Sequence, residues 1–375
     1  MRVLLTTAPL HGHFFPLVPL GWAFRALGHD VLVATSTNFL SIAAAAGLPA
    51  AATGAGIRVG DLADADSSQG IADVRYAHGL LFAHLAAAHL PATHALMDDW
   101  KPDFVISERA EFGGPIAAAT RDVPRIELQW GVAELSEYRA AAEEILEPQL
   151  TRLGLPGMPE PDLTLNPWPA NLRLPHAGHH RDLRHVAYNG TERVLAWMLT
   201  RGDRPRVCLT LGTVLPHVGS RRVIELVRGI IDRLAQRGYD IVVAMDDDVV
   251  ADLGPLPANV LHAGRVPLSQ TLPGCDVLIH HGGQGTSLTA LASGRPQVVL
   301  PQFDDQLDNA DAVERSGAGI SLPLAEATPE RVAKHCQYVL EGGRFREAAA
   351  SVAQDIAAQP SPVELAATIA ELARS

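Results

Sequence analysis

Cysteine is scarce in this sequence of 375 residues. Three cysteines are present, and they are widely spaced, with no CxxC pair (Cys208, Cys275 and Cys336). This scarcity excludes a disulfide scaffold and a thiolate-bound zinc. Three buried, reduced thiols in a cytoplasmic protein are the expectation that follows.

Excess positive charge and long apolar runs are also missing. The net charge is −12, and no basic stripe interrupts the acidic balance, which argues against a nucleic-acid partner. No apolar run approaches the roughly 20 residues of a membrane helix. The start of the chain, MRVLLTTAPLHGH, predicts a first strand rather than a signal peptide, because no small-residue cleavage site follows its apolar run. We therefore expect a cytoplasmic protein without a membrane segment.

What is present is an alternation of apolar strands and helices. Strand-like runs at 2–8, 30–35, 103–107 and 124–128 alternate with helical patterns in the first half. The pattern restarts at 206 and continues to about 319, which predicts an α/β protein with two doubly wound parallel sheets. A proline-rich stretch at about 154–190 lacks periodicity and predicts an extended connection. The predicted units are residues 1–190, 191–358 and a C-terminal helix at 359–375.

The segment HHGGQGTS, residues 280–287, lies between a buried strand and a helix. Free N–H groups and the positive end of the helix dipole lie at such a place, and the glycines let an oxyanion approach the backbone. The alternative is a glycine turn with no ligand. The segment is not a Walker loop, since no GKS or GKT follows, and its GGxG spacing is a poor dinucleotide fingerprint. That spacing disfavours a nicotinamide oxidoreductase.

A second polar pair follows the next predicted strand. Asp305 and Gln306, in LPQFDDQLDNA, precede a helix at the same edge of the sheet. An acid beside an amide suits the hydroxyls of a sugar, whereas the alternative is a solvated helix cap. Thr213 ends the strand of the TLGT segment and offers another phosphate contact.

The run CDVLIHHGGQGTSLTALASGRPQVVLPQFDDQLDNADAVERSGAGI, residues 275–320, resembles the nucleotide-sugar signature of the UDP-glycosyltransferase-like superfamily. The likeness is greatest to the bacterial branch that glycosylates macrolides, aromatic polyketides and enediynes, and it covers nearly the whole chain. The resemblance implies a GT-B fold, in which two Rossmann-like domains face a central cleft. It further implies an inverting, metal-independent transfer of a deoxysugar from dTDP to a natural product in antibiotic biosynthesis, and a last helix that returns to the first domain.

Carried over to this sequence, the resemblance places the donor in the second half. It implies that His281 and Thr286 bind the diphosphate, that Gly283 and Gly285 give it access to the backbone, and that Thr213 lies nearby. Asp305 and Gln306 would bind the sugar. The segment GRVPL matches the one that packs on the base, through Arg265 and Val266. No cofactor and no metal are implied.

The first half supplies the predicted general base. His13 lies in GHFFP, which resembles the family's GHxxP segment, and an imidazole titrates near neutrality. His11 is the rival base, and the alternative for either is a helix-capping or solvated histidine. The family pairs this base with an aspartate, whereas this chain has Glu108 there and Glu111 one turn further on. The partner of His13 is thus Glu108 or Glu111, with Glu108 preferred.

The acceptor side is expected to be apolar. We assign His11, Phe14 and Trp130 to it, although Trp130 suits the core equally well, and residues 54–96 should form much of the pocket. The histidine pairs 11/13, 179/180 and 280/281 lack HExxH spacing and do not indicate a metal. A homodimer is allowed, but no feature specifies one.

Two other functions remain open. One is a non-catalytic helper of another glycosyltransferase, and the other is a GT-B epimerase or hydrolase of nucleotide sugars. The sequence does not reveal the acceptor, the sugar, the atom that forms the new bond, or a preference for thymine over uracil.

Overall fold

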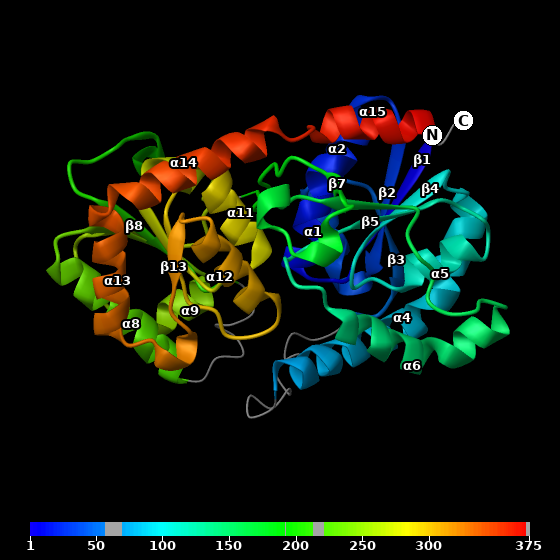
Figure 1. Ribbon diagram of the computed structural model, residues 1–375, viewed down its shortest axis with the longest axis horizontal. Helices are drawn as coiled ribbons and strands as arrows, with labels where there is room; N and C mark the ends of the chain where they lie inside the picture. Colours follow the sequence, from blue (N-terminus) through cyan, green and yellow to red (C-terminus); the bar gives the residue numbers. More distant parts are fainter. Residues whose placement is uncertain (57–69, 192, 213–220, 373–375) are drawn as a thin grey trace.

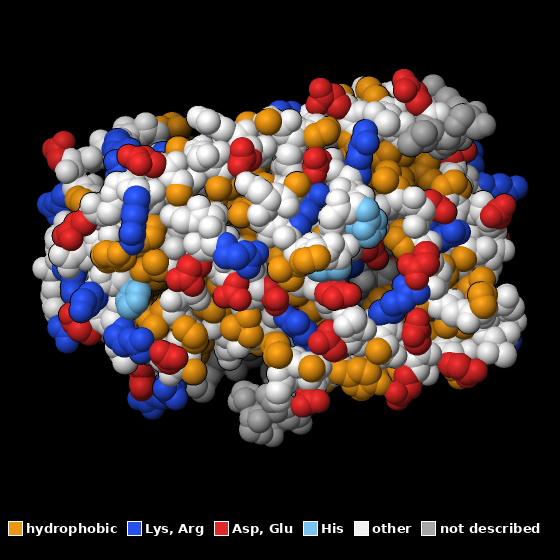
Figure 2. Space-filling model, in the orientation of Figure 1, with side chains coloured by type: hydrophobic (Ala, Val, Ile, Leu, Met, Phe, Trp, Pro, Cys, Tyr) orange, Lys and Arg blue, Asp and Glu red, His pale blue; other side chains and the backbone are white. Residues whose placement is uncertain are grey.

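The computed structural model describes residues 1–56, 70–191, 193–212 and 221–372. Two α/β units lie side by side, each with a parallel sheet between helices (Figure 1). This confirms the predicted α/β class. On the face shown in Figure 2, acidic and basic side chains are interspersed, without a continuous basic patch.

The N-terminal unit holds a seven-stranded sheet in the order β3-β2-β1-β4-β5-β6-β7, and all its neighbours pair in parallel. Its central strands are continuous apolar runs because helices cover both faces. The strands are β1 (Arg2–Thr6), β2 (Asp30–Ser36), β3 (Ala50–Gly54), β4 (Phe104–Glu108), β5 (Arg125–Leu128), β6 (Leu163–Asn166) and β7 (Arg181–Asp182). The helices are α1 (His11–Phe14), α2 (Val18–Ala26), α3 (Leu40–Ala45), α4 (Ile71–Trp100), α5 (Gly113–Ala119) and α6 (Ser136–Arg152).

The C-terminal unit holds a six-stranded parallel sheet in the order β10-β9-β8-β11-β12-β13. The strands are β8 (Arg206–Leu209), β9 (Asp240–Ala244), β10 (Val260–Gly264), β11 (Val277–His280), β12 (Gln297–Val299) and β13 (Gly319–Ser321). The helices are α8 (Arg221–Gln236), α9 (Asp247–Asp252), α10 (Leu268–Thr271), α11 (Gln284–Ala292), α12 (Asp305–Arg315), α13 (Pro329–Glu341) and α14 (Gly343–Ala358).

Both sheets reverse their strand order at one point. In the first sheet β1 neighbours both β2 and β4, and in the second β8 neighbours both β9 and β11. The connections after the two strands at such a point diverge to opposite faces and leave a crevice at the carboxyl edge of the sheet. The segments after β1, β4, β8 and β11 include most of the predicted site residues.

Two segments depart from a simple division of the chain. The proline-rich stretch was expected to be an extended connection, but β6 and β7 within it extend the first sheet, and Trp168 is fully buried. Helix α15 (Pro362–Leu372) lies against α2 in the N-terminal unit, and Leu365, Ala366 and Ile369 join its core. The boundaries at 190 and 358 stay predictions.

Helix α4 is long and apolar enough to cross a membrane by length and composition alone, contrary to the expectation from the apolar runs. A core helix passes the same test, and α4 packs against β3, α5 and α6. The absence of a membrane segment therefore stays a prediction.

Candidate active site

A cleft of about 1140 Å³ lies between the two units and is lined by residues from both. Pockets for one small ligand usually enclose about 300–1000 Å³, so this cleft is somewhat larger than most such pockets. The residues that line it include His11, His13 and Trp130 from the first unit and Arg265, His281, Thr286 and Asp305 from the second.

His13 lines the cleft and contacts the buried carboxylate of Glu108. Nδ1 of His13 lies 3.1 Å from Oε1 of Glu108, the last residue of β4, which is 1% exposed. The carboxylate also accepts hydrogen bonds from the N–H of Ala8 (3.0 Å) and of Ala110 (2.9 Å). Burial would raise the pKa of Glu108, but His13 and these N–H groups together lower it below its ordinary value. Glu108 is therefore an ionised partner for His13.

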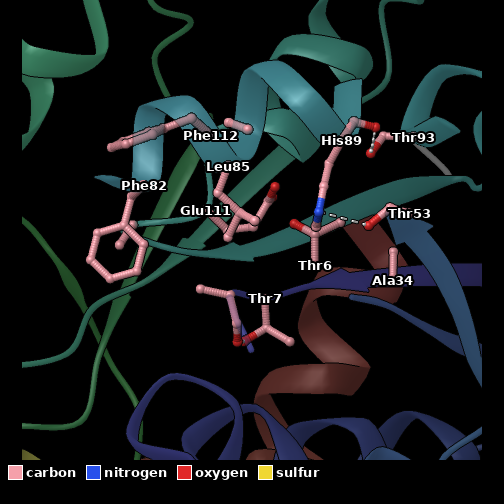
Figure 3. Close-up of a pocket in the computed structure, with 13 residues that line it drawn as sticks. Thr6, Thr7, Ala34, Thr53, Phe82, Leu85, His89, Thr93, Glu111 and Phe112 are labelled. Atoms are coloured by element: carbon pink, nitrogen blue, oxygen red, sulfur yellow. Dashed lines mark hydrogen bonds between the residues drawn. The ribbon is translucent and has the colours of Figure 1, made fainter. Parts of the chain in front are cut away.

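Glu111 faces a different region. Its two carboxyl oxygens accept from the N–H groups of Gly113 and Gly114, each at 2.9 Å, at the start of α5. Glu111 lines a cavity of about 10 Å³, and His89 is another of the residues around it (Figure 3). Burial raises the pKa of Glu111. The geometry thus selects Glu108 over Glu111 as the neighbour of His13.

Trp130 belongs to the cleft wall and to the core at once. It is 6% exposed, its indole N–H donates to Oε2 of Glu108 (2.7 Å), and its ring lies 4.6 Å from that of His13. Trp130 therefore holds the His13–Glu108 pair in place whether or not it also touches an acceptor.

The prediction for Phe14 is wrong. Phe14 is 0% exposed and packs at right angles to Phe39 in the core, because the residue after His13 on a helix points about 100° away from it. Phe15 lines the cleft instead. His11 also lines it and lies edge to face against Phe15 and Phe39. Burial lowers the pKa of His11.

In the second unit, His280 and His281 have different surroundings. His280 is fully buried, where its Nε2 lies 2.8 Å from Oε1 of Gln297 and its Nδ1 accepts from the N–H of Gly282 (3.1 Å). His280 therefore stabilises the turn between β11 and α11. His281 lines the cleft. Burial lowers the pKa of His281 to about 4 and that of His280 to about 3, so both rings are neutral at pH 7.

The glycines around His281 are required by close contacts. A Cβ on Gly283 would lie 2.4 Å from Nε2 of His281, and one on Gly212 would lie 2.6 Å from its Cε1. Gly282 has φ +92, and a Cβ there would lie 2.9 Å from the carbonyl oxygen of Gln306. Gly285 differs, since nothing lies within 4 Å of its Cβ position. Because α11 begins at Gln284, its first N–H groups have no partner within the helix and can hold an anion.

Asp305 and Gln306 form the first turn of α12 and line the cleft. Oδ2 of Asp305 accepts from Nδ2 of Asn309 (2.6 Å), and Oε1 of Gln306 accepts from the N–H of Gln302 (3.2 Å). Burial, followed by the charge of Asp304, raises the pKa of Asp305 to about 7.

The predicted base-binding segment also faces the cleft. Arg265 forms an ion pair with Asp246 (Nε to Oδ1, 2.9 Å), and Val266 is 8% exposed beside it. Thr213 lies outside the described residues.

Polar residues that join the two units escaped the sequence analysis. Oε1 of Gln284 accepts from the N–H of Gly131 and from the indole of Trp168. Asn309 accepts from the N–H of Val132 at 2.9 Å. Gln284 occupies the variable position of HHGGxGT, and Asn309 lies in the NA pair of the same signature, so only a structure shows what they contact.

Family models cover both units. The N-terminal domain of erythromycin biosynthesis protein CIII-like proteins matches residues 22–212, and the C-terminal domain of the same family matches residues 228–372. This chain belongs to the EryCIII-like glycosyltransferase family. Among its relatives, L-demethylnoviosyl transferase of Streptomyces niveus is 38% identical over all of this chain and 99% of its own length.

Two solved structures show the same architecture. The glycosyltransferase SsfS6 of Streptomyces sp. SF2575, in complex with thymidine diphosphate, is 32% identical with a TM-score of 0.86, over 99% of each chain. The spinosyn rhamnosyltransferase SpnG, in complex with spinosyn aglycone, is 32% identical with a TM-score of 0.87, over 98% of this chain and all of its own. The EryCIII-like chain therefore has the GT-B fold and is a nucleotide-sugar-dependent glycosyltransferase of the natural-product type.

Proposed function

We propose that this enzyme transfers a deoxysugar from a dTDP-sugar to an apolar natural-product aglycone in antibiotic biosynthesis, with inversion at the anomeric carbon and without a metal. The observation that carries the proposal is the pairing of His13 with Glu108 in the same cleft as the anion cradle of α11. SsfS6 binds thymidine diphosphate and SpnG binds an aglycone, which supports the two classes of substrate.

In the proposed reaction, each end of the cleft has its own role. His13 takes the proton of the acceptor hydroxyl while its oxygen forms a bond to the anomeric carbon, and Glu108 stabilises the imidazolium that results. The bond from that carbon to dTDP breaks on the opposite face, so the configuration inverts. The charge that develops on the leaving diphosphate is met by the amide groups that begin α11, by neutral His281 and by Thr286.

The wall around His13 indicates an acceptor with a flat apolar body. Phe82 lies 5.2 Å from the His13 ring, Trp130 lies on another side of it, and Phe39 and Phe15 pack around His11. Aromatic walls bind such surfaces well. A helper protein has no need of the buried His13–Glu108 pair, so that alternative takes second place. The cytoplasmic location, the lack of a nucleic-acid partner and the homodimer remain predictions.

Ligand binding tests the donor site first. Calorimetric titration with dTDP, UDP and NAD in the presence of EDTA should show binding of dTDP by the wild type and its loss in His281→Ala. His335→Ala, on α13 and outside the cleft, is the matched control. Failure of the wild type to bind either diphosphate would contradict the proposal.

Transfer assays test the base. His13→Ala and Glu108→Gln should retain dTDP binding but lower kcat by about 10²–10⁴-fold, because a general base contributes that much. Assays with dTDP-sugars and aromatic or macrocyclic acceptors measure this. Unchanged turnover in His13→Ala would move the base to His11.

A further inference from the structure

The residue before the predicted sugar-binding pair has an unusual backbone. Asp304 has φ +60 and ψ −132, and it is one of four described residues other than glycine with positive φ. Residues other than glycine rarely adopt this backbone conformation, because their Cβ crowds the backbone. Such a conformation persists only where the surroundings impose it.

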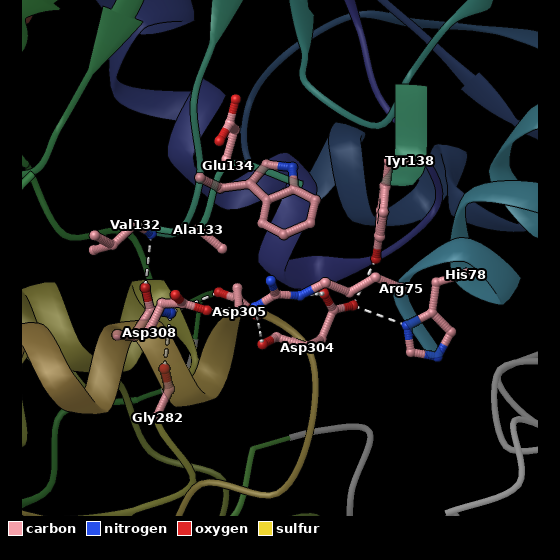
Figure 4. Close-up of polar contacts among 12 residues, drawn as sticks. Arg75, His78, Val132, Ala133, Glu134, Tyr138, Gly282, Asp304, Asp305 and Asp308 are labelled. Atoms are coloured by element: carbon pink, nitrogen blue, oxygen red, sulfur yellow. Dashed lines mark hydrogen bonds and ion pairs between the residues drawn. The ribbon is translucent and has the colours of Figure 1, made fainter. Parts of the chain in front are cut away.

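The side chains that bind Asp304 belong to the N-terminal unit. Its Oδ2 accepts hydrogen bonds from the hydroxyl of Tyr138 (2.6 Å) and from Nδ1 of His78 (2.8 Å), and its carbonyl oxygen accepts from Nη2 of Arg75 (2.9 Å). Arg75 also pairs with Asp308 in the first turn of α12. Figure 4 shows these groups converging on Asp304 from α4 and α6.

These contacts are shielded from water. Asp304, His78 and Tyr138 are 6%, 7% and 4% exposed. Burial would raise the pKa of Asp304, but the hydrogen bonds from His78 and Tyr138 and the charge of Arg75 together lower it. The carboxylate is therefore ionised, and a charged acceptor in a buried site binds its donors more strongly than a neutral one.

Asp304 is joined directly to Asp305. A Cβ added to Gly131 of the N-terminal unit would lie 2.9 Å from Cβ of Asp305, so Asp305 is packed tightly against that unit. Asn309 binds Asp305, the N–H of Val132 and the carbonyl oxygen of Gly282 (2.9 Å) together. The start of α12 is thus tied to the unit that carries His13.

We propose that Asp304 is a positioning residue, whose contacts with Arg75, His78 and Tyr138 align Asp305 and the donor sugar with His13 across the cleft. The inference rests on the proposed function for the identity of the donor. We name these four residues the Asp304 latch. We expect the latch to act on the sugar and not on the nucleotide, because Arg75, His78 and Tyr138 contact Asp304 directly before α12, whereas the nucleotide is assigned to α11 and the Arg265–Val266 segment.

Two variants test whether the Asp304 latch aligns the donor sugar or only stabilises the fold. Asp304→Asn removes the charge and places an amide N–H₂ against donors, while Tyr138→Phe removes a single hydroxyl and keeps the ring. Asp311→Asn, at an exposed acid of the same helix, is the control. We expect kcat/KM for the dTDP-sugar to fall by about 10–100-fold in Asp304→Asn and less in Tyr138→Phe, with the Kd of dTDP within about twofold of the wild type.

Hydrogen exchange needs no substrate, so it tests the Asp304 latch whatever the donor is. Hydrogen exchange at the amides of Gly131 and Val132 should become faster in both variants and stay unchanged in Asp311→Asn, because these amides bond to the C-terminal unit. Unchanged exchange, unchanged kcat/KM, or a Kd of dTDP weakened as much as kcat/KM would each overturn the latch. If the wild type uses no dTDP-sugar, the proposed function fails, and the exchange data still decide whether the latch exists.

Discussion

Glu108 and Glu111 are three residues apart, yet they act on different parts of the molecule. Glu108 ends β4 at the edge that faces the cleft, whereas Glu111 follows a turn and caps α5. Which of the two glutamates lies beside His13 depends on where the chain turns after β4. Their spacing in the sequence does not indicate this. The same holds for Phe14 and Phe15, since one residue of helix decides which ring meets the core.

The buried histidines predict how stability depends on pH. In the folded state the pKa of His280 is about 3 and that of His281 about 4, both below the ordinary 6.5. Between the folded-state pKa values and 6.5, these histidines bind protons in the unfolded chain but not in the folded chain. Stability therefore falls as the pH decreases from about 6.5 towards 4. His280→Asn keeps an acceptor for the N–H of Gly282 and removes one such proton. Its melting temperature should therefore fall less steeply from pH 7.5 to pH 5, and an unchanged slope would contradict the assignment.

At the scale of elements, the start of α11 combines two kinds of glycine. A Cβ on Gly283 would strike the His281 ring, whereas one on Gly285 would meet no protein atom. Gly283→Ala should therefore destabilise the fold by about 1–3 kcal/mol and weaken dTDP binding. Gly285→Ala should leave stability equal or higher, since alanine favours a helix, yet weaken dTDP binding by intruding on the diphosphate. Thermal melts and calorimetry on both variants test this, and equal stability losses would refute the distinction.

The sequence predicted the strands and helices better than the contacts between them. Apolar runs such as VLLT and VLIH mark central strands clearly, because both faces of a parallel strand are buried. Strand β6 was missed, since it is short and lies among prolines. Gln284, Asn309 and Asp304 were assigned no interdomain role because their partners lie more than 100 residues away, in a unit whose placement local patterns do not encode. The family signature located Asp305 and His281, whose roles remain predictions.

At the scale of the whole molecule, α15 ties the end of the chain to the first unit. Ile369 is 3% exposed in the core of that unit, far along the chain from the donor residues. Ile369→Ala should cost about 2–5 kcal/mol of unfolding free energy, as for other buried aliphatic residues, and leave the Kd of dTDP unchanged. Chemical denaturation and calorimetry measure the two quantities. Thr368→Ala, which removes a hydroxyl from a partly exposed site on the same helix, is the control, and weaker dTDP binding in Ile369→Ala alone would show that α15 acts on the cleft.

The chain passes between the two units twice, and the two passages touch. The N–H of Arg184 donates to the carbonyl oxygen of Pro360 (2.8 Å), so the outgoing and returning segments run together along one edge, at the top of Figure 1. Because both covalent connections lie along one edge, the two units can rotate about that edge more easily than they can slide past each other. Helix α4 lies at the opposite edge, where any such rotation produces the largest displacement. Such a rotation would separate Arg75 and His78 from Asp304, so we expect the cleft to open beside α4 and a bulky acceptor to enter from that side.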